Sequence, residues 1–270
     1  MGASMDLASS RLVLTGASGG IGREVASLLA ESGARLLLVA RQPGSLQELE
    51  RRHPGQVQIV VADLTRPEGR DALVAAVAAL GGLDGLIHAA GVNGFAWLEH
   101  QDEEVIGAMI DLNVTSTLLV TRRLLPWLRQ APEAVIVNVG SIFGSIGHPG
   151  FAAYCASKFA LRGFSEALRR ELADTRVRVR YIAPRATRTA MNRAPVVQMN
   201  ERLGVAMDAP RQVAVRIVQT LRGGRFERFL GWPERLFVRI NSLWPGLVDR
   251  AMRRQLPLVR DFARPSSSHS

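Results

Sequence analysis

The chain has 270 residues with 34 basic and 24 acidic side chains, so its formal net charge at pH 7 is +10. Its hydrophobic content of 47% is enough for a large core and excludes a disordered chain. The single cysteine, Cys155, excludes an intramolecular disulfide and is typical of a reducing compartment. We see no apolar run of about 18 residues and no signal-peptide pattern, and we therefore expect a cytoplasmic protein without a spanning helix. The sequence contains no zinc-ligand spacing and no recognition-helix signature, so we expect neither a metal nor a nucleic-acid partner.

Short apolar runs alternate with segments of helical periodicity. The apolar runs are continuous, as in strands buried on both faces, and they predict strands at 11–16, 35–40, 57–62, 83–91, 134–140, 177–184 and 228–231. Helices are predicted at about 20–32, 43–52, 67–80, 102–130, 151–174 and 209–223. Pro43 and Pro67 would each stand in the first turn of a helix. This alternation predicts an α/β fold, a doubly wound parallel sheet of about seven strands with helices on both faces and ligands at the carboxyl ends of the strands.

The ends of the chain differ in composition from its middle. Residues 1–9 predict a flexible tail, and residues 10–231 contain all the predicted strands. Residues 232–270 predict a basic amphipathic extension, with apolar residues at helical spacing, followed by a disordered tail. Pro233 and Pro245 would begin helices there or kink one. Such a segment can lie on an anionic membrane, cover a substrate pocket, contact another subunit or pack in the core, and the sequence leaves these alternatives open.

The first predicted strand runs into the glycine-rich stretch TGASGGIG, residues 15–22. Gly16, Gly20 and Gly22 would let the backbone turn tightly and approach a pyrophosphate that faces the N-terminus of the next helix. A tight turn without a ligand also uses glycine. The position of this turn between the first strand and the first helix nevertheless favours a dinucleotide site.

The stretch YCASK combines two rare residue types. Lys158 is the only lysine among the 34 basic residues, and Tyr154, one of two tyrosines, stands four residues earlier on the same face of a predicted helix. A neighbouring ammonium would lower the pKa of the phenol and make it a proton donor or acceptor near neutral pH. Arginine would replace this compact charge poorly, because its guanidinium is a wide planar fork. Ser141, just past the fifth strand, could donate a hydrogen bond to a substrate carbonyl oxygen.

The TGxxxGxG spacing and the arrangement Ser141…Tyr154-xxx-Lys158 resemble the short-chain dehydrogenase/reductase family over about residues 10–222. The resemblance implies a single Rossmann-type domain and hydride transfer between NADP(H) and a carbonyl/alcohol pair. Tyr154 would be the general acid in reduction, Ser141 would polarise the carbonyl, and Lys158 would tune Tyr154 and hold the nicotinamide ribose. Asn113, in DLNVTST, matches the family's fourth catalytic position, which supports a proton relay.

The end of the second predicted strand bears on the choice of cofactor. Ala40 stands where NAD-using members of the family carry Asp, and the next residue, Arg41, would attract the 2′-phosphate of NADP. We therefore expect NADP(H). The full set of expected cofactor contacts is Gly16, Ser18, Gly20, Ile21, Gly22, Arg41, Asp63, Leu64, Ala90, Gly91, Asn113, Tyr154, Lys158, Pro184, Thr187 and Thr189.

The sequence departs from the family pattern at two places. The fourth strand ends in HAAG, residues 88–91, where the family has Asn-Asn-Ala-Gly, so the side-chain amide that ties strands together is missing at Ala89. The sixth strand is followed by Pro184-Arg185 in place of Pro-Gly. Arg185 would either contact an anionic group of the substrate or point to solvent.

The loops after strands four, five and six provide a mostly apolar set of candidate substrate contacts: Phe95, Trp97, Ile142, Phe143, His148, Met191 and Met199. We therefore expect an NADPH-dependent carbonyl reductase with an apolar, acyl or lipid-like substrate. Two alternatives remain, a 3-oxoacyl-[acyl-carrier-protein] reductase and a catalytically silent dinucleotide-binding regulator. The family resemblance also implies a homodimer or homotetramer formed through the helices at 102–130 and 151–174. The C-terminal segment would add peripheral contact with the inner face of the membrane or with a carrier protein.

Overall fold

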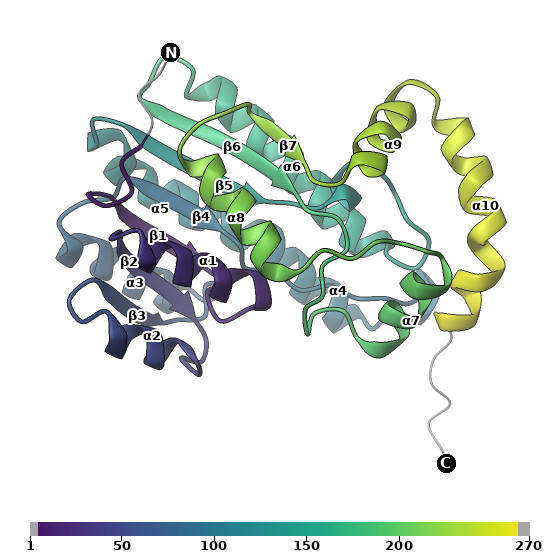
Figure 1. Cartoon of the computed structure of the whole chain (residues 1–270), viewed down its shortest axis with the longest axis horizontal. Helices are drawn as coiled ribbons and strands as arrows, with labels where there is room; N and C mark the ends of the chain where they lie inside the picture. The colour runs from purple at the N-terminus through teal and green to yellow at the C-terminus, as the bar shows by residue number, and fades with distance from the viewer. Residues whose placement is uncertain (1–4, 264–270) are drawn as a thin grey trace.

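A single parallel sheet forms the centre of the computed structural model, which describes residues 5–263 (Figure 1). Its seven strands are ordered β3-β2-β1-β4-β5-β6-β7. They are β1 (Arg11–Thr15), β2 (Arg35–Ala40), β3 (Val57–Val61), β4 (Gly85–His88), β5 (Ala134–Val139), β6 (Val177–Ala183) and β7 (Glu227–Phe229). The predicted doubly wound sheet is confirmed. The strand order reverses between β1 and β4, and this is the point where sheets of this kind bind ligands at the strand ends.

The helices cover both faces of the sheet. They are α1 (Gly20–Glu31), α2 (Leu46–Arg52), α3 (Pro67–Leu80), α4 (Glu103–Ile110), α5 (Ser116–Gln130), α6 (Ala152–Glu171), α7 (Ala194–Arg202), α8 (Pro210–Leu221), α9 (Trp232–Leu243) and α10 (Pro245–Phe262). A π-helical turn, Asp111–Thr115, joins α4 to α5, and short 3-10 turns lie at Leu98–His100 and Ile142–Gly144. Pro67 begins α3 as predicted, whereas α2 begins three residues after Pro43. The sequence did not predict α7.

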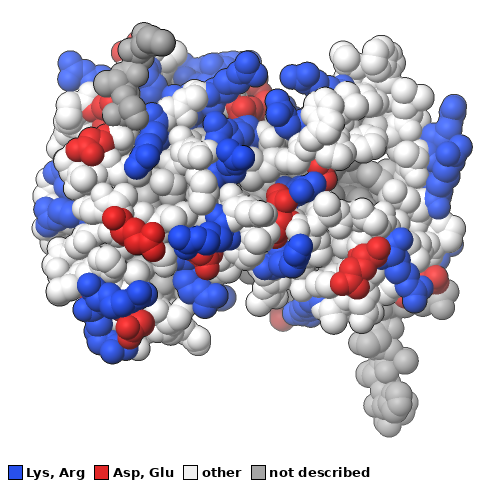
Figure 2. Space-filling view, viewed as in Figure 1, with Lys and Arg blue, Asp and Glu red and all other residues white. Residues whose placement is uncertain are grey.

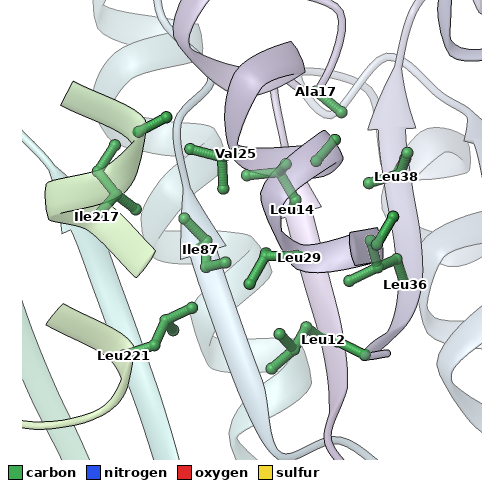
Figure 3. Packing of buried hydrophobic residues seen from close by; sticks show 14 of the residues in the cluster. Leu12, Leu14, Ala17, Val25, Leu29, Leu36, Leu38, Ile87, Ile217 and Leu221 are labelled. Atoms are coloured by element: carbon green, nitrogen blue, oxygen red, sulfur yellow. The ribbon is translucent and has the colours of Figure 1, made fainter. Parts of the chain in front are cut away.

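The two faces of β1 show why the apolar runs are continuous. Leu12 and Leu14 lie in a core cluster with residues of α1 and α8, and Val13 lies in a second cluster with residues of α3 and α5. Successive side chains of a strand point to opposite faces, so a strand covered on both sides needs an apolar residue at every position. Figure 3 shows the first cluster, with Leu29 of α1 and Ile217 of α8 packed against the strands.

The segment Glu103–Gln130 is long and apolar enough, by length and composition, to cross a membrane. Its second half, α5, packs Val120, Leu124 and Leu128 into the core cluster on one face of the sheet. The buried face of α5 therefore accounts for part of this apolar composition, since 33% of the most apolar window is buried.

The predicted tails extend beyond the described residues, at 1–4 and 264–270. Within the described part of the N-terminal tail, Met5 and Leu7 are buried in the same core cluster as Leu12. The prediction of a flexible segment is therefore wrong for these two residues, whose apolar side chains pack on the face of the sheet that α1 and α8 cover.

The predicted C-terminal extension forms two helices. Pro233 and Pro245 stand in the first turns of α9 and α10, as expected of helix starts. The two helices make an arm at the right of Figure 1, where α10 runs back to α7. We call α9 and α10 the C-terminal arm.

Candidate active site

Tyr154 and Lys158 stand one turn apart on α6, beside the carboxyl end of β5. Lys158 Nζ is 5.7 Å from the centroid of the Tyr154 ring and donates a hydrogen bond to the backbone oxygen of Val139 (3.3 Å). Ser141, two residues after β5, has its side chain hydrogen-bonded to Tyr154. The three side chains that the sequence singled out therefore converge at one place.

Burial changes the acidity of both groups on α6. It raises the pKa of Tyr154 to about 12, although the hydrogen bond with Ser141 acts in the opposite direction. It lowers the pKa of Lys158 to about 8. The expectation that the ammonium would lower the pKa of the phenol is wrong here, because the cost of desolvating the phenolate is the largest effect. Tyr154 is consequently protonated at neutral pH, the form that can donate a proton.

Asn113 lies in the π-helical turn between α4 and α5 and is buried. Its Oδ1 accepts a hydrogen bond from Val92 N, and its Nδ2 donates to Val92 O (both 2.9 Å) and to Ser157 Oγ (3.0 Å). A Cβ atom added to Gly91 would lie 3.1 Å from Asn113 Oδ1 and 3.5 Å from Lys158 Nζ, so both residues border the same point. The amide of Asn113 holds the loop after β4 against α6. Sequence periodicity did not indicate the π-helical turn, a feature frequent at functional sites.

Tyr181 of β6 supports the loop that carries Ser141. Its hydroxyl donates a hydrogen bond to Ser141 O (3.3 Å) and accepts one from Ser141 N (3.5 Å). A Cβ atom at Gly140 would lie 2.1 Å from this hydroxyl oxygen, and one at Gly144 would lie 2.5 Å from it. The sequence analysis did not assign Tyr181 to the site, and the glycines on both sides of Ser141 are the signal that could have shown it.

The glycine turn between β1 and α1 packs directly on neighbouring backbone. Gly16 has a φ of 66°, and a Cβ atom there would lie 2.6 Å from backbone atoms of Ala90. At Gly22 a Cβ atom would lie 2.1 Å from the carbonyl oxygen of Gly16, and at Gly20 it would lie 2.8 Å from Thr189 Cγ2. Ser18 stands on the same turn. The tight packing of the turn therefore requires glycine at these positions, and the turn places the N-terminus of α1, whose backbone N–H groups can bind an anion such as a pyrophosphate, at the end of β1.

Aromatic rings surround Tyr154. Phe143 and Phe151 have ring centroids 6.4 and 6.2 Å from that of Tyr154, and Phe95 packs on Phe151 at 4.8 Å. His148 stacks on Phe143 at 5.0 Å. The same cluster includes buried side chains from three helices: Cys155 of α6, Val196 and Met199 of α7, and Val259 of α10. Helices α7 and α10 thus form an apolar cover beside the tyrosine.

Comparison with known proteins identifies this arrangement. The family model described as short chain dehydrogenase matches residues 11–199. The chain belongs to the short-chain dehydrogenase family. An uncharacterized oxidoreductase of Staphylococcus saprophyticus is 34% identical over 184 residues, which cover 67% of this chain and 75% of the relative. The 3-oxoacyl-[acyl-carrier-protein] reductase FabG of Vibrio cholerae is 31% identical over 191 residues, 70% of this chain and 78% of the relative.

Solved structures agree with this assignment. A short chain dehydrogenase from Burkholderia cenocepacia in complex with NADP matches with a TM-score of 0.79 and 26% identity, covering 92% of this chain and 99% of that one. The chain is thus an oxidoreductase by family. Its glycine turn and Tyr154 stand at strand ends near the sheet's switch point.

The ends of β2 and β3 carry the residues predicted to contact the adenosine end of the cofactor. Asp63 Oδ1 accepts hydrogen bonds from Thr65 N (2.9 Å) and Thr65 Oγ1 (2.7 Å). These bonds, with smaller effects from Arg41 and Arg66, lower the pKa of Asp63. Arg41 is exposed just after β2, and the next residue after Asp63, Leu64, is buried. The structure therefore brings the predicted Arg41 and Asp63 to the same edge.

The loop after β6 carries the remaining predicted cofactor contacts, Pro184, Thr187 and Thr189. Pro184 O accepts a hydrogen bond from Ile142 N (3.0 Å), which ties this loop to the loop after β5. Thr187 is buried, and its hydroxyl donates to Arg185 O (3.0 Å). Asn93 Nδ2 donates to Asn192 Oδ1 (3.3 Å) and connects the loops after β4 and β6. Thr189, the other threonine of this loop, contacts the glycine turn, since a Cβ atom at Gly20 would lie 2.8 Å from Thr189 Cγ2.

The departure from the family pattern at the end of β4 has a structural compensation. Thr15 Oγ1 accepts hydrogen bonds from Ala89 N (3.2 Å) and Ala90 N (3.3 Å), which joins β1 to the end of β4 without the missing amide. His88 is buried, and its Nε2 lies 2.9 Å from Thr121 Oγ1 of α5. Burial lowers the pKa of His88 to about 3, so this histidine is neutral at pH 7.

Arg185, the second departure, is engaged within the protein. Its Nη2 and Nε bond to Asp208 Oδ1 (2.7 and 2.9 Å), and its Nη1 lies 3.4 Å from Glu234 Oε1 of α9. Neither contact with a substrate anion nor a side chain directed to solvent matches this geometry. Arg185 instead connects the loop after β6 to the C-terminal arm.

The candidate substrate residues fall into two groups. Phe95, Phe143 and His148 belong to the ring cluster at Tyr154, and Trp97 lies under the guanidinium of Arg260 at 5.8 Å. The other three candidates lie apart from these rings. Ile142 is buried in a cluster with Tyr181, Met199 is buried in the cover, and Met191 is exposed. Substrate contact by Ile142 and by the other candidates stays a prediction.

Sequence reasoning found Met199 of the cover but missed the other apolar residues of the cluster around Tyr154. Phe151 stands three residues before Tyr154, and Phe262 of α10 packs against the same cluster. The apolar residues at helical spacing in the C-terminal extension reach Val259 and Phe262, and this pattern could have indicated the contribution of α10 to the cover. Among the described residues, no three His, Cys, Asp or Glu side chains gather as metal ligands.

Proposed function

We propose that the protein reduces the carbonyl group of an apolar substrate with NADPH, and that Tyr154 donates the proton. The observation that carries the proposal is the partly buried, protonated phenol of Tyr154, hydrogen-bonded to Ser141 and bordered by aromatic rings. An apolar wall favours the burial of an apolar substrate and offers few groups that could bind a polar substrate.

The residues present fit a nicotinamide dinucleotide. The glycine turn leaves no room for side chains at Gly16 and Gly22, which suits a pyrophosphate at the N-terminus of α1. Lys158 is a buried ammonium whose hydrogen-bond partner within the described chain is a single carbonyl oxygen, so further N–H groups remain for a ribose hydroxyl. When bound, NADPH supplies the hydride that adds to the carbonyl carbon.

Side chains of the protein bind the substrate's carbonyl oxygen and donate the proton that it receives. The hydroxyl of Ser141 donates a hydrogen bond to the carbonyl oxygen and orients it towards Tyr154. Tyr154 transfers its phenolic proton to this oxygen as negative charge develops there, and the product is the alcohol. The ammonium of Lys158 stabilises the resulting phenolate until a proton from solvent restores the phenol. Asn113 and Tyr181 keep the walls of the site in position through the hydrogen bonds described above.

The preference for NADPH rests on the adenosine end of the site. Ala40 provides no carboxylate, and the cations Arg41 and Arg66 both act on Asp63 at this edge. A 2′-phosphate would gain favourable charge interactions there. We expect Arg41→Ala to reduce the ratio of NADPH to NADH efficiency about tenfold, a loss of about 1.4 kcal/mol. Arg51→Ala, on the exposed end of α2, is the control; a ratio unchanged by Arg41→Ala would contradict the assignment.

The substrate class can be tested by following NADPH oxidation with apolar ketones, aldehydes and 3-oxoacyl thioesters. We expect turnover that rises with the apolar area of the substrate. Tyr154→Phe should remove this turnover while NADPH still binds. If the wild-type chain binds NADPH and turns over no carbonyl compound, the catalytically silent regulator is the correct function.

A second candidate function is the reduction of 3-oxoacyl groups on an acyl carrier protein. The FabG relative at 31% identity favours it, and the net charge of +10 would attract an acidic carrier. A 3-oxoacyl group reduced at least tenfold more efficiently on the carrier protein than as a small thioester would support this candidate. Equal efficiency would favour a free apolar substrate.

We further propose a cytoplasmic homodimer or homotetramer formed through α4, α5 and α6. Three apolar side chains on these helices are exposed, Val105 and Ile110 of α4 and Phe159 of α6, and burying them between subunits would be favourable. Phe159→Glu should dissociate the oligomer in light scattering after size-exclusion chromatography. Val215→Glu is the control, because Val215 is an exposed apolar residue on α8, outside the proposed interface, and the variant should keep the oligomer.

A further inference from the structure

The C-terminal arm has an apolar outer surface that neither folding nor the proposed chemistry uses. Six large apolar side chains are exposed on it: Trp232, Leu236, Phe237, Leu243, Trp244 and Leu247. We call these six the arm surface. Trp232 is 74% exposed and Trp244 is 61% exposed, values that are unusual for the largest side chains. Exposed apolar patches of this kind mark interaction sites.

The opposite side of the arm is already packed. Val238 and Val248 are buried in a cluster with Ile142 and Tyr181, behind the loop that carries Ser141. Trp232, Leu236 and Leu243 are four and seven residues apart, so they form one stripe on α9 that faces away from Val238. The arm is therefore held to the domain by one face and presents the other to its surroundings.

Cations border the arm surface. Arg235 and Arg239 are exposed on α9, and Arg250, Arg253 and Arg254 are exposed on α10. Of the acids on the arm, Glu234 is engaged by Arg185, and Asp249 and Asp261 of α10 are exposed, fewer than the five arginines. Figure 2 shows pale, uncharged surface over the arm and a run of basic residues along its outer edge at α10. Aromatic and aliphatic side chains beside arginines match the chemistry of an anionic bilayer surface, where tryptophan favours the headgroup level.

We propose that the arm surface docks the protein on an anionic lipid membrane, with Trp232 and Trp244 inserted at headgroup level and the arginines in contact with lipid phosphates. A second copy of the chain is a poorer occupant, because a self-complementary contact through this surface would bring two basic rims together. The inference is independent of the proposed reaction. Since α10 also supplies Val259 to the cover at Tyr154, docking places the apolar side of the active site near the lipid.

Vesicle binding by the full chain tests the proposal. We expect the protein to sediment with phosphatidylcholine vesicles that contain phosphatidylglycerol, to bind pure phosphatidylcholine at least tenfold more weakly, and to lose affinity as salt rises. Tryptophan emission should shift to shorter wavelength on binding. No binding to the anionic vesicles, or equal binding to both compositions, would overturn the proposal.

Matched variants locate the contact. Trp232→Ser with Trp244→Ser should weaken partitioning at least tenfold, whereas Val61→Ser with Val215→Ser, exposed apolar residues outside the arm, should leave it unchanged. Arg250→Gln, Arg253→Gln and Arg254→Gln together should remove the preference for anionic vesicles, and Arg51→Gln with Arg52→Gln should not. Thermal melting and turnover of a water-soluble carbonyl substrate show that each variant is folded. If the tryptophan variant instead turns a dimer into a monomer and keeps its vesicle affinity, the arm surface is a subunit interface and the proposal is wrong.

Discussion

The glycine turn at residues 15–22 and the apolar cover from α7 and α10 border the same active site but are made of different parts. The turn is backbone packed on backbone: a Cβ atom at Gly16 would meet Ala90, and one at Gly22 would meet the carbonyl oxygen of Gly16. The cover consists of side chains, with Met199 and Val259 buried against Phe151. A backbone cradle suits a ligand part with constant chemistry, such as a pyrophosphate, whereas a cover of side chains can differ in shape and so select the substrate.

This difference predicts that the two regions can be damaged separately, one at the level of cofactor binding and the other at the level of substrate binding. The residues of α6 between them serve both and should be the most sensitive to change.

Tyr154→Phe should have the largest effect, a loss of about a thousandfold or more in kcat for carbonyl reduction, because it removes the proton donor. Lys158→Arg should also abolish most turnover, although it keeps a positive charge, because Lys158 is buried and its site is shaped for a compact ammonium. NADPH oxidation measures both effects. Ala156→Ser, at an exposed position of α6 between Tyr154 and Lys158, is the control; full turnover by Tyr154→Phe would refute the catalytic assignment.

Gly22→Ala should weaken NADPH binding about tenfold to a hundredfold, since the new methyl group overlaps the carbonyl oxygen of Gly16 and forces the turn apart. Isothermal titration with NADPH measures this effect. Gly163→Ala is the matched control, because a Cβ atom at this position of α6 has no neighbour within 4 Å. The substitution should slightly stabilise the helix and leave NADPH binding unchanged.

Phe262→Ala should act on the other region. Removing this ring from the cover should raise KM for an apolar ketone about tenfold and leave the Kd for NADPH unchanged. Phe237→Ala, on the exposed side of the arm, should change neither constant in the absence of membranes. A larger effect of Phe262→Ala on NADPH binding than on KM would show that the cover is not a separate substrate region.

His88 should make the stability of the domain sensitive to acid, an effect on unfolding that leaves turnover at neutral pH unchanged. Its folded pKa of about 3 lies below the ordinary value of 6.5, so its stabilising contribution is complete above pH 6.5 and is lost as the pH falls towards 3. The expected loss is about 2 kcal/mol over roughly the first one and a half pH units. Urea unfolding of wild type and His88→Asn should show a shallower pH dependence in the variant, while the exposed His100→Asn should behave like wild type.

Much of the fold and of the site follows from patterns that are local in the sequence. Continuous apolar runs predicted all seven strands, because a strand covered on both faces needs apolar residues throughout. The glycine turn, Tyr154 and Lys158 were found from spacing alone, since a strand-to-helix turn and a pair at i and i+4 depend on near neighbours in the chain.

Only the tertiary structure decided the features that depend on segments far apart in the sequence. One such feature is the upward shift of the pKa of Tyr154, because the rings and helices that desolvate this residue lie outside the Tyr154–Lys158 pair on α6. The burial of Ile142 and the pairing of Arg185 with Asp208 and Glu234 were others. A side chain's type states what it can bind; the elements packed around it determine its solvation and its partners, and no spacing along the chain records them.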